Sequence, residues 1–171
     1  MNFTTSEENY IKSIYHLQQE TGLVNTNSLA AEMQTRAASV TDMLKKLKGK
    51  KLLQYEKYRG FKLNDAGKKA ALDVVRKHRL WEFFLVEKLQ FDWDKVHAIA
   101  EDLEHISSEE LIQRLDNYLG NPSFDPHGDP IPDKHGKIPV INQQSLSDIP
   151  VNKTVTVSSV SNQTAQMLEM L

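Results

Sequence analysis

Residues 97–105, with the sequence HAIAEDLEH, are rich in side chains that bind metal ions. On an α-helix, which turns ~100° per residue, the two histidines and two glutamates of this stretch share one arc of about 100°. A second pair, spaced four residues apart, lies in RKHRLWE at 76–82. Imidazole and carboxylate donors suit Mn(II), Fe(II) or Zn(II), and a set without sulfur disfavours Cu(I). The candidate ligands are His78, Glu82, His97, Glu101, Glu104 and His105.

This spacing alone is compatible with a metal sensor, a di-metal carboxylate oxidase or an exposed helix face held by ion pairs. Di-iron bundles favour a Glu-x-x-His pair, which Asp102 and His105 match only approximately. The His-Glu-x-x-His pattern of zinc proteases is absent. Because four such residues share one arc, a metal site is favoured over an ion-paired face. An oxidase would also need a substrate pocket between the ligands, and we expect that the protein is not an enzyme.

The charged residues are distributed unevenly along the chain, whose overall net charge is −2. Residues 34–79 hold fourteen basic and four acidic residues, whereas residues 80–133 hold three basic and thirteen acidic ones. These blocks of +10 and −10 indicate two different partners, an anion for the first block and cations for the second.

The elements of the basic block follow the order of a winged helix-turn-helix. Apolar residues at helical spacing predict helices over 6–21, 27–34 and 37–49. A change to alternating spacing predicts a two-stranded hairpin over 51–63. In such a fold the second helix of the motif enters the major groove of DNA, and the wing lies over the backbone.

Side chains of the helix over 37–49 and of the hairpin are suited to DNA. Arg36 can form two hydrogen bonds with guanine, and Asp42 can accept one from cytosine, while the lysines suit phosphates. A Lys-rich helix is by itself more often a solvated face, but the order of the elements and the positive charge favour DNA binding. The candidate DNA-contacting residues are Arg36, Ala38, Ser39, Thr41, Asp42, Lys45, Lys46, Lys57 and Arg59.

The rest of the chain is predicted to be helical and then irregular. Helical spacing continues over 64–90, 92–105 and 107–119. All six prolines lie between 122 and 150, which predicts a loop or linker there, and residues 151–160 alternate like a strand. No internal repeat is evident. The expected N-caps of the five helices that have one are Ser6, Asn27, Asn64, Asp92 and Ser107.

The composition is that of an ordinary soluble protein of one or two domains. The 171 residues are 39% hydrophobic and 26% charged. The absence of cysteine excludes disulfides and thiolate metal sites, and it fits a cytoplasmic location. The acidic residues near the start of the chain argue against a signal peptide. The lack of a long apolar run argues against a membrane span.

Six motifs of the chain are shared with one family of regulators. They are SEENYIKSIY at 6–15, AASVTDMLKKL at 37–47, YEKYRGFKL at 55–63, RKHRLWE at 76–82, KVHAIAEDLEH at 95–105 and GDPIP at 128–132. Over about residues 4–136 the chain therefore resembles the iron- and manganese-dependent transcriptional regulators, the diphtheria-toxin-repressor and manganese-transport-regulator group.

The resemblance implies a repressor that Mn(II) or Fe(II) activates and that binds palindromic DNA operators as a homodimer. The winged helix would bind DNA, and the helices over 64–119 would dimerise and carry the metals. Some members add a small Src-homology-3-like barrel, of which residues 140–171 resemble the linker and the first part. One site would use Asn9, Glu101, Glu104 and His105, and an ancillary site would use His78, Glu82 and His97, with Gln163 the nearest candidate for a barrel ligand.

Three positions depart from the family or divide its branches. Asn9 stands where the family usually has methionine or aspartate, and an amide oxygen is a weaker, neutral donor. Glu101 resembles the manganese branch, because the iron branch commonly has cysteine there. Lys12 replaces another ligand of the manganese branch and cannot ligate when charged. The metal stays open between Mn(II) and Fe(II), with Mn(II) favoured by ligand hardness.

The sequence therefore predicts a mainly α protein that acts as a metal-dependent repressor of metal-ion homeostasis. The winged helix-turn-helix is expected over 1–72, the metal-binding and dimerisation domain over 73–138, and a linker with a partial β segment over 139–171. The alternatives are a winged-helix regulator with a non-metal effector and a di-metal carboxylate oxidase.

Overall fold

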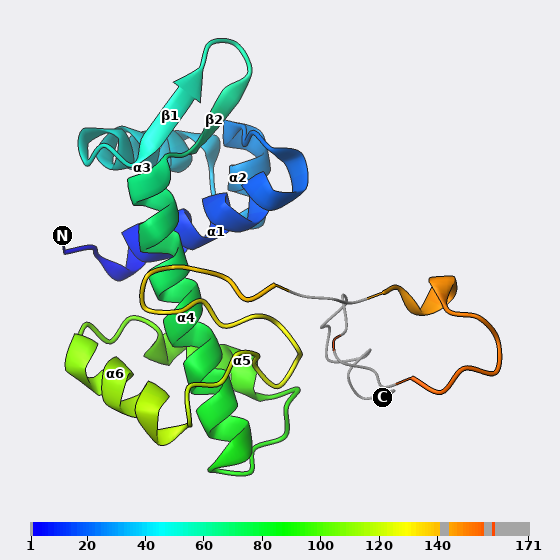
Figure 1. Ribbon diagram of the computed structural model, residues 1–171. Helices are drawn as coiled ribbons and strands as arrows, with labels where there is room; N and C mark the ends of the chain where they lie inside the picture. Colours follow the sequence, from blue (N-terminus) through cyan, green and yellow to red (C-terminus); the bar gives the residue numbers. More distant parts are fainter. Residues whose placement is uncertain (1, 141–143, 156–158, 160–171) are drawn as a thin grey trace. The chain divides into compact units, whose positions relative to one another are not determined.

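The computed structural model describes residues 2–140, 144–155 and 159 (Figure 1). The chain divides into two compact units, unit 1 (Met1–Val75) and unit 2 (Arg76–Leu171). The domain limits expected from the sequence, after residues 72 and 138, stay a prediction. Among the described residues, none of the helices combines the length and the apolar character that a bilayer span requires.

Unit 1 has the predicted winged helix-turn-helix order, with three helices followed by an antiparallel hairpin. The helix over 37–49 has the predicted bounds. Its apolar residues at helical spacing, Val40, Leu44 and Leu47, are buried in the core, so its polar residues face outward. The elements of unit 1 are α1 (Thr5–Thr21), α2 (Thr26–Glu32), α3 (Ala37–Gly49), β1 (Leu53–Glu56), β2 (Gly60–Leu63) and the first part of α4 (Asp65–Glu87).

Two predicted N-caps of unit 1 are wrong. Thr4 caps α1 in place of Ser6, because its side chain accepts from the backbone of Glu7 while the Glu7 carboxylate accepts from the Thr4 N–H. Asn25 caps α2 in place of Asn27 through the same reciprocal pair with Ser28. The predicted caps lack a suitable partner three residues on, where the chain has asparagine and alanine.

The hairpin is fastened to the body of unit 1 at Phe61. The N–H and carbonyl of Phe61 form two hydrogen bonds with Val24, each 2.9 Å long. Gly60, opposite Glu56 in the ladder, has a φ of +136°. A Cβ atom there would lie 2.4 Å from the Val24 carbonyl oxygen, so only glycine allows this close approach.

Unit 2 packs two short helices and a long loop against the second part of α4. These helices are α5 (Val96–Leu103) and α6 (Glu109–Tyr118). Asn64, on the N-terminal side of α4, accepts from the Gly67 N–H, as predicted for a cap. The core of unit 2 consists of apolar side chains from all these parts: Leu80, Trp81, Ala100, Ile112, Leu115 and Ile131.

The helices α5 and α6 are shorter than the sequence predicts. Asp92 does not cap α5, because its carboxylate pairs with Lys95 and its carbonyl closes a separate turn with the Lys95 N–H. The helix ends at Leu103, with Glu104 as its C-cap and His105 beyond it, so the prediction of four ligands on one helical arc is wrong for these two residues. Ser108 caps α6 in place of Ser107, by accepting from the N–H of Leu111.

The proline-rich segment is a loop, as predicted. Its only helical turn in the described residues is the 3₁₀ turn η1 (Leu146–Asp148). Of the strand predicted over 151–160, residues 151–155 form a turn and irregular backbone, and 156–158 and 160 lie outside the described residues. Gln163 lies outside them too.

Replacing Gly60 by alanine should destabilise unit 1, because the new Cβ collides with the Val24 carbonyl and the left-handed backbone disfavours it. We expect a loss of about 2 kcal/mol in the free energy of unfolding. Gly49→Ala is the control, since a Cβ there meets no atom within 4 Å. Far-UV circular dichroism in urea measures both, and equal midpoints for the two variants would contradict the prediction. Tryptophan fluorescence separates out unit 2, which holds Trp81 and Trp93.

Candidate functional site

Helix α4 places His78 and Glu82 on its buried side, one turn apart. His78 Nε2 lies 2.9 Å from Glu82 Oε1. Helix α5 brings His97 to the same point, where its Nδ1 lies 3.1 Å from His78 Nε2 and 3.2 Å from Glu82 Oε1. Ligand atoms of the three residues lie within 4.8 Å of one another, a spacing that one metal ion can span. The structure thus brings together the ancillary set named from the sequence.

The other oxygen of Glu82 faces a second group of ligands, which the sequence analysis missed. His127 Nδ1 lies 3.7 Å from Glu82 Oε2 and 3.9 Å from Asp125 Oδ1. All three side chains are buried, and their ligand atoms again lie within 4.8 Å of one another. Glu82 therefore belongs to two candidate metal groups at once, one through each carboxylate oxygen.

The loop around His127 fixes the orientation of its ring. Asp125 Oδ1 accepts from the N–H of His127 at 2.8 Å and from that of Asp129 at 2.9 Å. His127 Nε2 donates to the Trp93 carbonyl at 3.0 Å, and the two rings are stacked. Since a carbonyl only accepts, Nε2 carries the hydrogen, and Nδ1 is the atom that can ligate. This buried Nδ1 has no hydrogen-bond partner among the described residues, which fits an atom that can bind a cation.

The charges of this cluster are strongly coupled. Burial alone would raise the pKa of Glu82, but the neighbouring imidazoles of His127, His78 and His97 hold it well below its ordinary value. Burial, followed by the negative charge of Glu82, raises the pKa of Asp125 to about 6. Burial would lower the pKa of His127, but the Glu82 carboxylate raises it. A proton on His127 thus balances part of the negative charge of Glu82.

Glu104 is joined to the same cluster from the end of α5. It is fully buried, and its Oε2 lies 2.6 Å from His78 Nδ1. A carboxylate at the far nitrogen of a histidine fixes the ring and strengthens it as a ligand. Glu104 therefore supports His78 in this structure, whereas the resemblance places it among the ligands of the other site.

The remaining predicted ligands lie around this cluster or outside unit 2. Glu101 Oε1 is 3.6 Å from His97 Nε2, and both side chains are exposed. His105 Nε2 is 3.6 Å from Glu104 Oε1. Asn9 belongs to α1 in unit 1, so its part in a metal site stays a prediction.

A short sequence pattern marks Asp125 and His127, the two candidate ligands that were not predicted from the sequence. The pattern D-x-H-G occurs at 125–128 and again at 133–136, so the absence of an internal repeat is wrong at this short scale. Asp133 accepts from the backbone of His135 and Lys137, as Asp125 does from the equivalent residues. Only the first copy is buried against Glu82, which the pattern by itself does not reveal.

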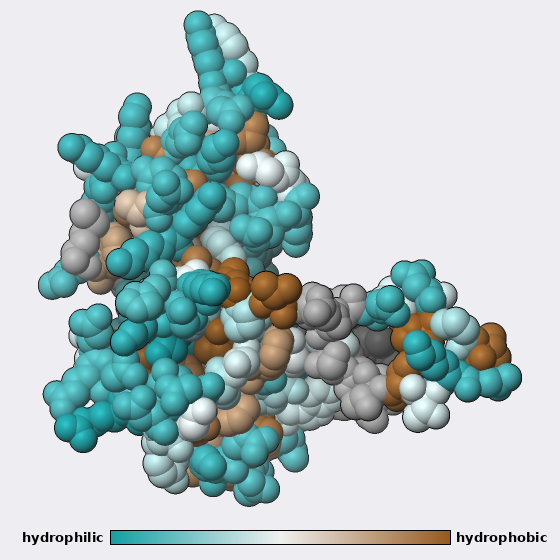
Figure 2. Space-filling model, in the orientation of Figure 1, coloured by the Kyte–Doolittle hydropathy of each residue, from teal (hydrophilic) through white to brown (hydrophobic). Residues whose placement is uncertain are grey.

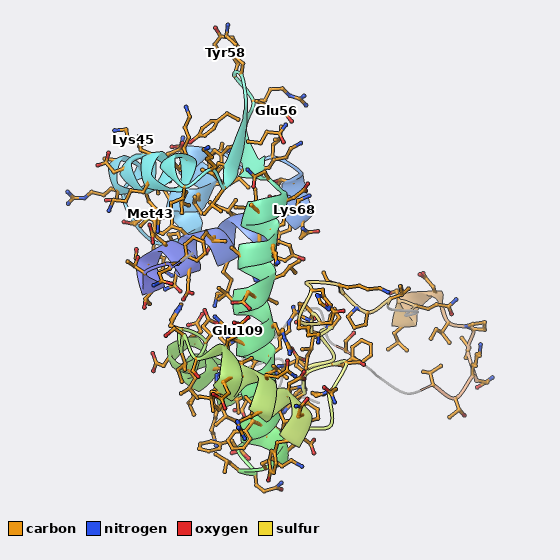
Figure 3. The ribbon with its side chains drawn as sticks, turned by 60° about the vertical axis from the view of Figure 1, so that its left-hand side comes forward. Met43, Lys45, Glu56, Tyr58, Lys68 and Glu109 are labelled. Atoms are coloured by element: carbon orange, nitrogen blue, oxygen red, sulfur yellow. The ribbon has the colours of Figure 1, made fainter. Side chains whose placement is uncertain are left out.

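The predicted DNA-contacting residues are all exposed. Figure 2 shows a largely hydrophilic surface over α3 and the hairpin, and Figure 3 shows Lys45 on α3 and Tyr58 at the tip of the hairpin. Asp42 and Lys45 pair at 2.9 Å, and Thr41 donates to the Ala37 carbonyl. Lys50, in contrast, is tied to the buried Glu7 at 2.8 Å and holds the unit together. The exposed candidates are Arg36, Ala38, Ser39, Thr41, Asp42, Lys45, Lys46, Lys57 and Arg59.

Comparisons with known proteins match both units. The model of the iron-dependent repressor N-terminal DNA-binding domain matches residues 2–61, and that of the metal-binding and dimerisation domain matches residues 64–133. The HTH-type transcriptional regulator MntR of Bacillus subtilis is 38% identical over 112 residues, which are 66% of this chain and 78% of MntR. The chain belongs to the iron-dependent repressor family.

Relatives in this family include both iron- and manganese-dependent repressors. The iron-dependent repressor IdeR of Mycobacterium tuberculosis is 34% identical over 125 residues, which are 73% of this chain and 54% of IdeR. The chain thus spans about half the length of such relatives. A manganese-dependent transcriptional repressor in complex with manganese has 38% identity and a TM-score of 0.82, over 96% of this chain and 76% of that structure. This likeness confirms the mainly helical fold with its N-terminal winged helix.

Glu82→Gln should lower the affinity for Mn(II) by more than about a hundredfold, because Glu82 contributes to both ligand groups. The variant keeps the volume of the side chain and removes its charge. Glu87→Gln, at an exposed position on the same helix, is the matched control. The electron paramagnetic resonance signal of free Mn(II) measures the bound fraction, and equal affinity of the two variants would remove Glu82 from the metal centre.

The affinity for Mn(II) should fall by at least about tenfold when the pH is lowered from 7.5 to 5.5. Ligation needs an ionised Asp125, whose pKa is about 6, and a neutral His127, whose pKa is raised. Protons therefore compete more strongly as the pH falls through this range. Titrations at several pH values, with circular dichroism to verify folding, test this. An affinity that stays constant from pH 7.5 to 5.5 would argue against these ligands.

Proposed function

We propose that this chain is a repressor whose affinity for DNA operators rises when unit 2 binds Mn(II) or Fe(II). The observation that carries this proposal is the buried cluster around Glu82, in a family member whose other unit is a winged helix. A bound divalent cation would supply the positive charge that two buried carboxylates and an unpartnered imidazole nitrogen call for.

Unit 1 supplies the DNA contacts in this proposal. The outer face of α3 enters the major groove, where Arg36 bonds a guanine and Ser39 and Thr41 bond base edges or phosphates. Lys45 and Lys46 neutralise phosphates and fix the position of the helix. The buried face of α3 is held by the core, so this outer face is presented as a rigid surface.

Unit 2 supplies the metal ligands. His78, His97 and Glu82 would hold one ion, and the other Glu82 oxygen, Asp125 and His127 would hold a second. Glu104 keeps the His78 ring in place. Glu101 and His105 lie next to these residues, and we propose that they complete a site together with Asn9, as the resemblance implies.

The donor set favours Mn(II) among the two metals. Every donor is an oxygen or an imidazole nitrogen, and carboxylate-rich sets suit hard ions such as Mn(II). The similar structure described as manganese-dependent supports the same choice. IdeR, which is described as iron-dependent, keeps Fe(II) as the other candidate.

The assembly that we propose is a homodimer on a palindromic operator. The family model of residues 64–133 is one of metal binding and dimerisation. Two α3 helices in a dimer engage half-sites about one helical turn apart, or a multiple of it. We place the protein in the cytoplasm, with access to the DNA, and we propose no enzymatic activity, in line with its repressor relatives.

Metal-dependent DNA binding is the direct test. Chelator-treated protein is mixed with fragmented genomic DNA in the presence of chelator, Mn(II) or, under anaerobic conditions, Fe(II). Recovery of a few palindromic fragments only with metal is expected, and it ranks the two metals. Equal recovery with chelator would leave a winged-helix DNA-binding protein without metal control.

Replacing Glu104 by Gln together with His105 by Ala should abolish the metal dependence of operator binding while the dimer persists. The pair removes the support of His78 and one predicted ligand without opening a large cavity. Glu109→Gln, on the exposed first turn of α6 (Figure 3), is the control. Fluorescence anisotropy of a labelled operator measures affinity, and sedimentation measures the dimer. An unchanged response to metal would exclude these residues from metal sensing.

A further inference from the structure

The tip of the hairpin presents an aromatic ring to solvent. Tyr58 is 94% exposed, the highest value among the large hydrophobic side chains of the described residues. Lys57 and Arg59 flank it, and Lys57 Nζ lies 5.0 Å from the centre of the ring. Figure 3 shows Tyr58 at the outer end of the hairpin, pointing away from the rest of unit 1. An exposed ring between two cations indicates a contact surface rather than a folding role.

The hairpin that carries Tyr58 is held in place by a turn hydrogen bond and by ion pairs. The N–H of Arg59 donates to the Glu56 carbonyl at 3.1 Å and closes the turn. The Glu56 carboxylate pairs with Arg59 at 3.3 Å and with Lys62 at 3.2 Å. The tight contact between Gly60 and Val24 then fixes the hairpin to the core. Tyr58 is thus presented at a defined place relative to α3.

The backbone at Tyr58 is not one that an aromatic residue prefers. Its φ is +62°, in the left-handed region where glycine and asparagine are common and bulky residues are rare. A glycine would suit this turn better, so the ring is not explained by the needs of the hairpin. Strain of this kind at an exposed tip points to a function of the side chain.

We infer that Tyr58 inserts into the minor groove of the operator, beside the major-groove contact of α3. This inference rests on the proposed function of unit 1. The minor groove of B-DNA is about 6 Å wide and lies between two rows of phosphates, which suits a flat ring with a cation on either side. Lys57 and Arg59 bind those phosphates, and the Tyr58 hydroxyl donates to the acceptors on the groove floor.

This contact would give the protein a preference that α3 does not supply. The floor of the minor groove carries only acceptors at an A·T pair, whereas a G·C pair adds the amino group of guanine. That amino group blocks the ring and offers no acceptor to the hydroxyl. Operator positions under the hairpin should therefore favour A·T pairs, in either orientation.

Tyr58→Gly tests the inference, because it removes the ring and the strained backbone together. The thermal midpoint should stay the same or rise, Mn(II) binding should stay unchanged, and operator affinity should fall about tenfold. Tyr58→Phe keeps the ring and should lose about threefold. Lys57→Ala is the matched control: it should weaken binding equally for all sequences and lower the salt dependence by about one phosphate contact.

The operator used is one recovered from genomic fragments, with single pairs in its flanks changed to G·C or to inosine·cytosine. Inosine·cytosine has the minor groove of A·T and the major groove of G·C. The wild type should bind A·T and inosine·cytosine flanks alike and G·C flanks several-fold more weakly, whereas Tyr58→Gly should bind all three alike. Equal affinity of wild type and Tyr58→Gly, or discrimination that follows the major groove, would overturn the inference alone. A wild type that binds no DNA would overturn the proposed function as well.

Discussion

The buried carboxylate of Glu82 is the constraint on which unit 2 depends. A charged group with 3% exposure is costly unless positive charge and hydrogen bonds surround it. Three histidines surround Glu82: His78 of α4, His97 of α5 and His127 of the loop that packs against Trp93. The packing of α4, α5 and this loop therefore depends on the charge of Glu82 and on the groups that balance it. Whatever cation sits beside Glu82 becomes part of the fold of unit 2.

Protons and metal ions compete for that role. Without metal, a proton on His127 balances part of the charge of Glu82, whose carboxylate raises the pKa of that histidine, while burial raises the pKa of Asp125 to about 6. A divalent ion would displace that proton and bind the same atoms. The same side chains can therefore bind either protons or a metal ion, as reversible metal binding requires.

Elements whose apolar residues recur at regular spacing could be predicted from the sequence. Helix caps and loop ligands, which depend on individual side-chain contacts, could not. The bounds of α3 and the presence of the hairpin followed from apolar spacing, because one face of each is buried. The caps failed because reciprocal side-chain bonds, as between Thr4 and Glu7, decide where a helix begins. Asp125 and His127 lie in a proline-rich loop without any period, and only tertiary packing shows that their loop, and not its copy at 133–136, meets Glu82.

Salt screening limits how the charge of a metal ion could act on DNA binding. Adding positive charge at Glu82 favours a polyanion in general, but at physiological ionic strength salt screens charges beyond about 8 Å. A field effect of this kind would raise affinity for any DNA sequence and would not select an operator. Selective activation requires that the metal favours one arrangement of the protein in which both recognition surfaces fit their half-sites. By linkage, operator binding must then strengthen metal binding by the same factor. Since protons compete with the metal, they must oppose operator binding through the same cluster.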